Sequence, residues 1–162
     1  MYDYLRYASP VGMLTVAAVG DELTALVLDG QQYAARHLAG EGRERETPAL
    51  LAAKDWLDAY FAGRRPDAGL LPLAPRGTAF QQAVWRELQR IPYGETTTYG
   101  ALAARLGSSA RAVGSAVGRN PLSILIPCHR VLGADGCLTG YAGGLANKEK
   151  LLRLEGASFR GA

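Results

Sequence analysis

A short proline-rich segment, Arg64–Arg76, separates two parts of this chain that differ in their secondary-structure pattern. It holds three prolines, and proline interrupts both helices and sheets. Before the segment lie short runs of β-branched and aromatic residues; after it, apolar residues recur at helical spacing. The chain has 162 residues, which is enough for two small domains. We therefore predict an N-terminal domain over residues 1–75 and a C-terminal domain over residues 76–162.

The N-terminal part has the pattern of a small α/β domain. Turn-forming residues separate three short strand-like runs, which cover residues 3–7, 14–19 and 23–28. Residues 31–46 are polar and charged, and we expect a loop or a weak helix there. Thr47 is a good helix N-cap before Pro48, and Gly63 is a natural end for that helix. We predict a three-stranded antiparallel sheet with one helix.

The C-terminal part is predicted to be mostly helical, which makes the whole chain α/β in the α+β sense. Caps and apolar spacing predict helices over residues 78–91, 99–106, 110–118 and 145–154. The apolar residues 122–126 are expected to form an extended segment that leads into Cys128.

The charge pattern is more informative than the net charge, which is only +3. From Arg105 to Arg130 the charged residues are four arginines, with no aspartate or glutamate among them. Such a segment can form a surface that faces phosphate groups. Four solvated arginines are an equally good interpretation on charge alone.

Other features of the composition exclude several classes of protein. No apolar run is long enough for a membrane span, and residues 1–6 lack the pattern of a signal peptide. We therefore expect a cytoplasmic setting and no membrane partner. The cysteines are Cys128 and Cys137. With no CxxC motif and only two histidines, we expect no metal site.

Two short predicted helices joined by a turn after Gly107 have the layout of a helix-turn-helix motif. The first helix, residues 99–106, carries an apolar stripe. The second, residues 110–118, is built of small residues and Arg111. Small side chains allow close approach to a neighbouring helix or to DNA. An ordinary helical hairpin has the same pattern.

Cys128 is followed directly by His129, and this pair is the strongest candidate for chemistry. A thiolate is the reactive form of cysteine, and a nearby base or positive charge is needed to populate it at neutral pH. Alone, a buried and inert cysteine is the commoner interpretation. A histidine base works best with a carboxylate behind it, and the C-terminal segment offers Glu149 and Glu155. At a helix end, the dipole disfavours the charge of Glu155, which suggests a specific partner. A solvated glutamate at a helix end is the commoner interpretation on this observation alone.

Taken together, these residues resemble the O6-alkylguanine–DNA alkyltransferase family (methylated-DNA–protein-cysteine methyltransferases), and its bacterial constitutive type most closely. The resemblance covers residues 77–156, and residues 1–75 resemble the family's variable N-terminal domain only loosely. Its most specific part is Pro-Cys-His-Arg-Val with Asn-Pro beginning eight positions before the cysteine. The matching stretches are Gly77–Trp85, Ile91–Tyr99, Ala110–Gly114, Asn120–Pro121, Ile126–Val131, Thr139–Leu145, Lys148–Glu149 and Leu151–Gly156.

The resemblance implies a ribonuclease H-like N-terminal domain and a one-use transfer of an alkyl group from guanine O6 to Cys128, with O4-alkylthymine as a further possible substrate. It implies that His129 acts as the base through a water, with Glu155 behind it, and that Asn120 braces the active-site turn. Tyr99 is implied to donate to guanine N3, and Arg111 to fill the gap left by a flipped base. Other residues implied to contact DNA are Thr98, Ala110, Ala112, Gly114 and Ser115. The implied pocket for the base consists of Tyr99, Val131, Tyr141, Ala142 and the carbonyl of Cys128.

The resemblance further implies duplex DNA as the partner, contact through the minor groove, a monomer, and no cofactor. Some relatives carry serine where Ala142 stands, so one side-chain contact is absent here. The first half of the chain has no cysteine, which excludes the zinc site of some relatives. Cys137 matches no functional position.

Three rival functions remain at this point. The first is a recognition module that binds alkylated DNA without transfer and recruits excision repair; such proteins usually have tryptophan at the position of Cys128. The second is a helix-turn-helix transcription regulator, for which the reactive motif would be unexplained. The third is a cysteine hydrolase, which would not need the basic helical pair.

Overall fold

The computed structural model describes residues 1–32 and 34–161. The chain divides into two compact units. Unit 1 comprises residues 1–76 and 121–125, and unit 2 comprises residues 77–120 and 126–162. Among the described residues, no helix is both long and apolar enough to cross a membrane.

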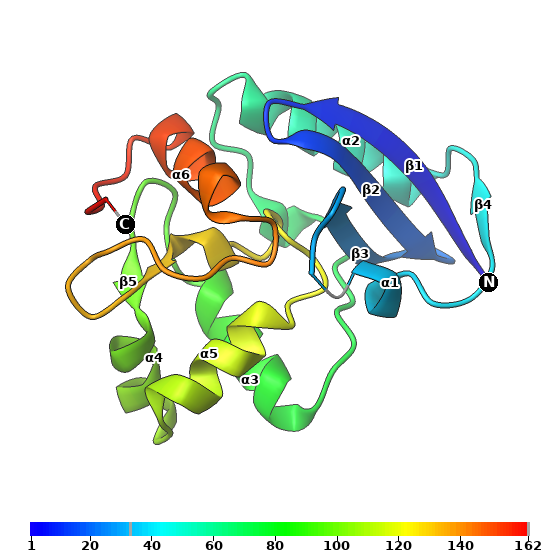
Figure 1. Cartoon of the computed structure of the whole chain (residues 1–162). Coiled ribbons are helices and arrows are strands. Elements are labelled where there is room, and N and C mark those ends of the chain that lie inside the picture. Colours follow the sequence, from blue (N-terminus) through cyan, green and yellow to red (C-terminus); the bar gives the residue numbers. More distant parts are fainter. Residues whose placement is uncertain (33, 162) are drawn as a thin grey trace. The chain divides into compact units, whose positions relative to one another are not determined.

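Unit 1 contains a sheet with strand order β3-β2-β1-β4 (Figure 1). The three predicted strands are confirmed and pair antiparallel in sequence order; they are β1 (Tyr2–Ser9), β2 (Gly12–Val19) and β3 (Glu22–Leu28).

The prediction of three strands was incomplete, because β4 (Gly42–Glu44) pairs parallel with β1. This strand lies where we expected a loop or weak helix. Its sequence has no apolar alternation, and long-range contacts hold it in place. Asp3 on β1 forms ion pairs with Arg43 and Arg45 at 3.3 and 3.5 Å. The ring of Tyr2 lies so close to Gly42 that a Cβ there would be 2.6 Å from it.

Helix α2 (Pro48–Phe61) packs on the sheet of unit 1, after the very short helix α1 (Ala34–His37) (Figure 1). The predicted cap is confirmed, since the Thr47 hydroxyl accepts a hydrogen bond from the amide of Leu50 at 3.3 Å. The buried face of α2 consists of Ala49, Leu50, Ala53, Trp56, Leu57 and Tyr60.

Two irregular segments cover the outer edge of β3. The amide of Leu23 donates to the carbonyl of Pro72, and that of Leu26 to Pro121, both at 2.8 Å. Residues 64–76, which include the 3-10 turn η1 (Ala68–Leu70), are therefore attached to the sheet along part of their length. Because an open strand edge invites pairing with other chains, these segments also protect β3.

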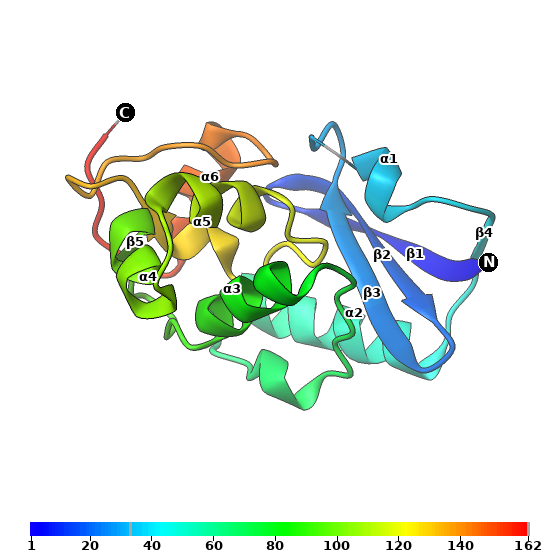
Figure 2. The ribbon, with the colours of Figure 1, turned by 90° about the horizontal axis from the view of Figure 1, so that it is seen from below.

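Unit 2 consists of short helices and a two-stranded parallel ribbon (Figure 2). The four predicted helices are confirmed. The helices are α3 (Ala79–Gln89), α4 (Tyr99–Leu106), α5 (Ala110–Gly118) and α6 (Leu145–Leu154); the ribbon strands are β5 (Thr97–Thr98) and β6 (Val131–Leu132). Buried Trp85 on α3 donates its indole N–H to the carbonyl of Ala116 on α5 at 2.9 Å, which ties α3 to the helix-turn-helix pair.

Candidate active site

The β5–β6 ribbon joins two segments that are far apart in sequence. Thr97 pairs with Val131, and Thr98 pairs with Leu132. Helix α4 begins with Tyr99 directly after β5, and the 3-10 turn η2 (Cys128–Arg130) directly precedes β6. The ribbon thereby brings the start of the helix-turn-helix pair to the reactive-cysteine motif.

Cys128 is buried, with 5% of its surface exposed, at the start of the 3-10 turn η2. Its amide donates to the carbonyl of Ile126 at 2.8 Å. The expectation that an extended segment over residues 122–126 leads into Cys128 is wrong. Leu122 forms an isolated bridge with Leu26, and Ile124 has a φ of 72°, so the backbone turns before it reaches the cysteine.

Asn120 closes the loop that precedes the cysteine. Its side-chain amide donates to the carbonyl of Ile126 at 2.8 Å, and both groups are buried. These two residues are the points at which the chain leaves unit 2 and returns to it. The hydrogen bond therefore fixes the start of the Ile126–Arg130 segment.

His129 lies inside unit 2, with 0% of its surface exposed. Its Nε2 is 2.7 Å from Oε2 of Glu155, so a neutral ring carries its proton on Nε2 and has a lone pair on Nδ1. That Nδ1 is buried and has no hydrogen-bond partner among the residues that the structure describes. Burial lowers the pKa of His129 below its ordinary value of 6.5, against the opposing influence of Glu155. The imidazole is thus neutral at physiological pH and able to accept a proton.

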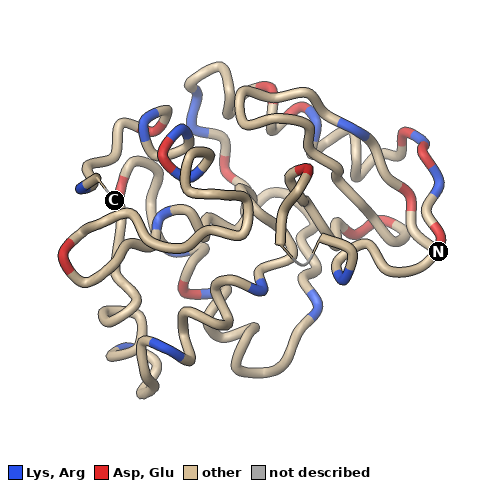
Figure 3. Tube along the Cα trace, in the orientation of Figure 1, with Lys and Arg blue, Asp and Glu red and all other residues tan. Residues whose placement is uncertain are grey.

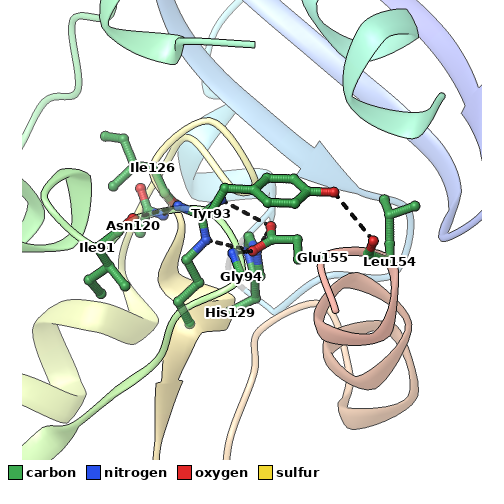
Figure 4. Close-up of polar contacts among 9 residues, drawn as sticks. Ile91, Tyr93, Gly94, Asn120, Ile126, His129, Leu154 and Glu155 are labelled. Carbon is green, nitrogen blue, oxygen red and sulfur yellow. Dashed lines mark hydrogen bonds and ion pairs between the residues drawn. The ribbon is translucent and has the colours of Figure 1, made fainter. Parts of the chain in front are cut away.

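Glu155 is the C-cap residue of α6 and is the carboxylate that faces His129. The other candidate, Glu149, is partly exposed and pairs with Arg153 at 3.1 Å. Figure 4 shows the polar contacts that converge on Glu155. One comes from the amide of Gly94, at 3.2 Å. Gly94 has a φ of +81°, and a Cβ there would lie 3.0 Å from the backbone oxygen of Glu155, which explains the glycine.

Arg130 is the second strong partner of Glu155. Its Nε donates to Oε1 at 2.8 Å and its Nη2 to Oε2 at 3.1 Å. Burial alone would raise the pKa of Glu155, but the hydrogen bonds and charges of His129 and Arg130 outweigh it and hold that pKa well below its usual range. The carboxylate therefore stays ionised.

Lys148 is a site residue that the sequence analysis missed. It is fully buried on α6, and its ammonium donates to the carbonyls of Val131, Thr139 and Gly140. Burial lowers its pKa to about 8, although the charge of Cys128 opposes this. A signal was available, because Leu151 and Leu152 follow at the i+3 and i+4 spacing of a buried helix face.

Tyr99 stands beside this lysine, whose Nζ is 5.9 Å from the centre of the Tyr99 ring. Burial is the main cause that raises the pKa of Tyr99, the charge of Cys128 adds to it, and a hydrogen bond with Thr139 opposes it. The hydroxyl therefore stays protonated and available as a donor.

The other expected pocket residues differ in exposure. Val131 is buried, whereas Tyr141 and Ala142 are half-buried. The carbonyl of Val131 accepts a hydrogen bond from the ammonium of Lys148.

The helix-turn-helix pair presents a surface without acidic residues. Neither α4 nor α5 contains an aspartate or glutamate (Figure 3). Ala110, Arg111 and Ser115 are exposed on α5, while Ala112 and Gly114 are half-buried. The Thr98 hydroxyl accepts from the amide of Ala101 at 3.1 Å, so it caps α4 in addition to any contact with a ligand.

These features define a class of protein: one that combines a helix-turn-helix surface with a buried cysteine followed by a His–Glu pair. Comparison of the sequence with models of known protein families identifies the family. Residues 79–157 match the family model described as "6-O-methylguanine DNA methyltransferase, DNA binding domain". Residues 2–75 match the model for its ribonuclease-like domain. The chain belongs to the methylated-DNA–protein-cysteine methyltransferase family.

Individual relatives support this assignment over nearly the whole chain. The methylated-DNA–protein-cysteine methyltransferase of Haemophilus influenzae is 45% identical, over 94% of this chain and 85% of its own. The constitutive enzyme of Bacillus subtilis is 43% identical over 99% of both chains. Among solved structures, Mycobacterium tuberculosis OGT in complex with DNA matches with a TM-score of 0.85 and 45% identity, covering 95% of this chain and 92% of that one.

Proposed function

We propose that this protein repairs alkylated duplex DNA by moving the alkyl group from guanine O6 to the sulfur of Cys128. Each molecule acts once, since the product is a stable thioether. The observation that carries the proposal is the arrangement behind the cysteine. His129 is neutral and holds its Nε2 proton against Glu155 at 2.7 Å, and its Nδ1 has no hydrogen-bond partner in the described part of the chain. This is the state of a histidine ready to accept a proton.

The transfer is a displacement reaction at the alkyl carbon. His129 takes the thiol proton through a water, and the thiolate attacks the carbon in line with the C–O bond. The sulfur–carbon bond forms, the carbon–oxygen bond breaks, and its electron pair stays on the guanine. Tyr99 donates a hydrogen bond to guanine N3 and so stabilises the leaving anion. Guanine finally holds the proton that the thiol lost.

The target atom lies within the base stack, so the nucleotide must rotate out of the duplex. Extrusion costs a few kcal/mol and is easiest for a mispaired base. We assign α5 to the minor groove, because its small residues Ala110, Ala112 and Gly114 permit close approach. Arg111, in the first turn of α5, fills the space that the base leaves. Thr98 and Ser115 contact the same DNA.

Several residues are assigned to the extruded base and its surroundings. Val131, Tyr141 and Ala142 line its pocket, together with the carbonyl of Cys128. Asn120 holds the preceding turn through its hydrogen bond to Ile126. We further propose that the protein acts as a monomer in the cytoplasm.

The proposal is tested by digesting a duplex with one O6-methylguanine after incubation with the protein and measuring the nucleosides. We expect one deoxyguanosine restored per molecule of wild type or Cys137→Ser, and none with Cys128→Ser. Tight, lesion-selective binding without restored deoxyguanosine would instead identify a recognition module. Repeated turnover would point to a different chemistry.

A further inference from the structure

Arg130 is buried next to the proposed base and is held from several sides. Beyond its two hydrogen bonds to Glu155, its Nη1 donates to the carbonyl of Ile91 at 2.6 Å. The guanidinium also lies 5.8 Å from the centre of the Tyr93 ring, and the Tyr93 hydroxyl donates to the carbonyl of Leu154 at 3.3 Å. Arg130 therefore joins the loop before β5 to the end of α6. Only 11% of its side chain is exposed, so its charge is poorly screened.

The charges around His129 show why a permanent cation matters there. The carboxylate of Glu155, at the end of α6, contacts the imidazole. The positive charges of Lys148 on α6 and Arg130 on η2 also act on it. Cys128, also on η2, contributes a negative charge when it is a thiolate. Burial raises the pKa of Tyr99 on α4, and that charge raises it further. A buried carboxylate beside a histidine favours the imidazolium. Such a histidine would already hold a proton and could not take one from the thiol.

With Arg130 present, the Glu155–Arg130 pair is neutral and His129 need not be charged to balance it. Resting on the proposed function, we infer that Arg130 is a positioning residue that keeps His129 an uncharged base, by neutralising Glu155 through two parallel hydrogen bonds. Burial is the main cause that lowers the pKa of His129, and the positive charge of Arg130 adds to it by opposing protonation of the imidazole directly. The role of Arg130 is thus distinct from that of Glu155, which orients the ring.

The experiment uses the fact that the chain has only two histidines, His37 and His129. Histidine ring nitrogens are labelled with 15N, and their signals are followed against pH in the wild type, Arg130→Gln and Arg130→Lys. We expect Arg130→Gln to move the titration of His129 upward by about one pH unit or more, a typical effect of one nearby charge. Arg130→Lys keeps the charge and is expected to stay near wild type. His37 serves as the internal reference.

The second readout is the rate of methyl transfer against pH. In Arg130→Gln, the acidic limb of the profile should shift upward together with the histidine titration. Arg153→Gln is the control, because Arg153 is an exposed arginine of α6 that forms a surface ion pair with Glu149. If the titration of His129 in Arg130→Gln is the same as in Arg153→Gln, Arg130 has a merely structural role and the inference is wrong.

A double variant tests the inference in case Arg130→Gln does not fold. Arg130→Gln combined with Glu155→Gln restores neutrality, so we expect it to fold and to leave His129 uncharged. If the double variant is unfolded as well, the charge-balance argument is overturned. Absence of transfer by the wild type would contradict the proposed function only, because the histidine titration still tests Arg130.

Discussion

The carboxylate of Glu155, at the very end of α6, lies 2.7 Å from Nε2 of His129. An anion at a helix C-terminus is opposed by the helix dipole. Here the amide of Gly94 and the guanidinium of Arg130 offset that cost. The position of the carboxylate is therefore unfavourable for α6 itself but allows the hydrogen bond with His129.

Glu155→Gln keeps the size of the side chain but removes the charge that orients and polarises His129. We expect the rate of methyl transfer to fall about 100-fold, within the usual range for general acid–base contributions. Single-turnover kinetics on methylated duplex measures this. Glu149→Gln, on the same helix, is expected to react at the wild-type rate. Equal rates for both variants would show that the His–Glu contact has no part in the reaction.

The same two residues predict how stability depends on pH. Both have folded pKa values below their ordinary values of 6.5 for His129 and 4.5 for Glu155. The unfolded chain therefore binds more protons in the acid range, and stability rises with pH. The contribution of His129 is complete above pH 6.5 and decreases as the pH falls below it. That of Glu155 is complete above pH 4.5 and is lost as the pH falls further.

Urea unfolding across this range measures the effect. In His129→Gln, the loss of stability that begins below pH 6.5 should become smaller, while the loss below pH 4.5 remains. An unchanged slope between those two values would contradict the assignment of a neutral, buried imidazole.

Some parts of this fold can be predicted from local sequence alone, and the helices that begin at a capping residue are the clearest example. Helices α2, α3 and α5 begin after Thr47, Thr78 and Ser109, whose hydroxyls each accept a backbone hydrogen bond. Capping is a local interaction, so sequence alone located these helices well. The cysteine motif and its His–Glu pair were likewise found from residue types and the family resemblance.

The elements that were missed depend on distant partners. Strand β4 has a polar sequence and exists through its pairing with β1. Residues 121–125 belong to unit 1 although they lie between two parts of unit 2, which no local pattern indicates. Lys148 and Arg130 are buried charges, and their roles became visible only with their acceptors.

We predict that activity declines at alkaline pH because Lys148 loses its charge. Its pKa of about 8 means that it loses its charge above that pH, which removes a positive charge near Cys128 and one of its donated protons. We expect the methyl-transfer rate to stop rising and then fall above about pH 8. The chain has only three lysines, so 13C-labelled lysine can report the titration directly. Lysine signals that all titrate at the ordinary value would contradict this account.

Arg111 is predicted to act on DNA and not on the chemistry of the cysteine. Arg111→Ala should slow repair in duplex DNA by at least about tenfold, because extruding the base costs a few kcal/mol that the side chain helps to offset. Reaction with free O6-methylguanine base should be unchanged. Arg64→Ala, an exposed arginine of unit 1, is the control and is expected to match wild type on both substrates.

The most direct test of the central claim is intact-protein mass spectrometry after mixing the protein with a duplex that carries one O6-methylguanine. The account predicts a gain of one methylene mass per protein molecule, mapped by peptide analysis to Cys128 and absent in Cys128→Ala. A protein that binds this duplex selectively but gains no mass, or gains it at Cys137, would contradict the account.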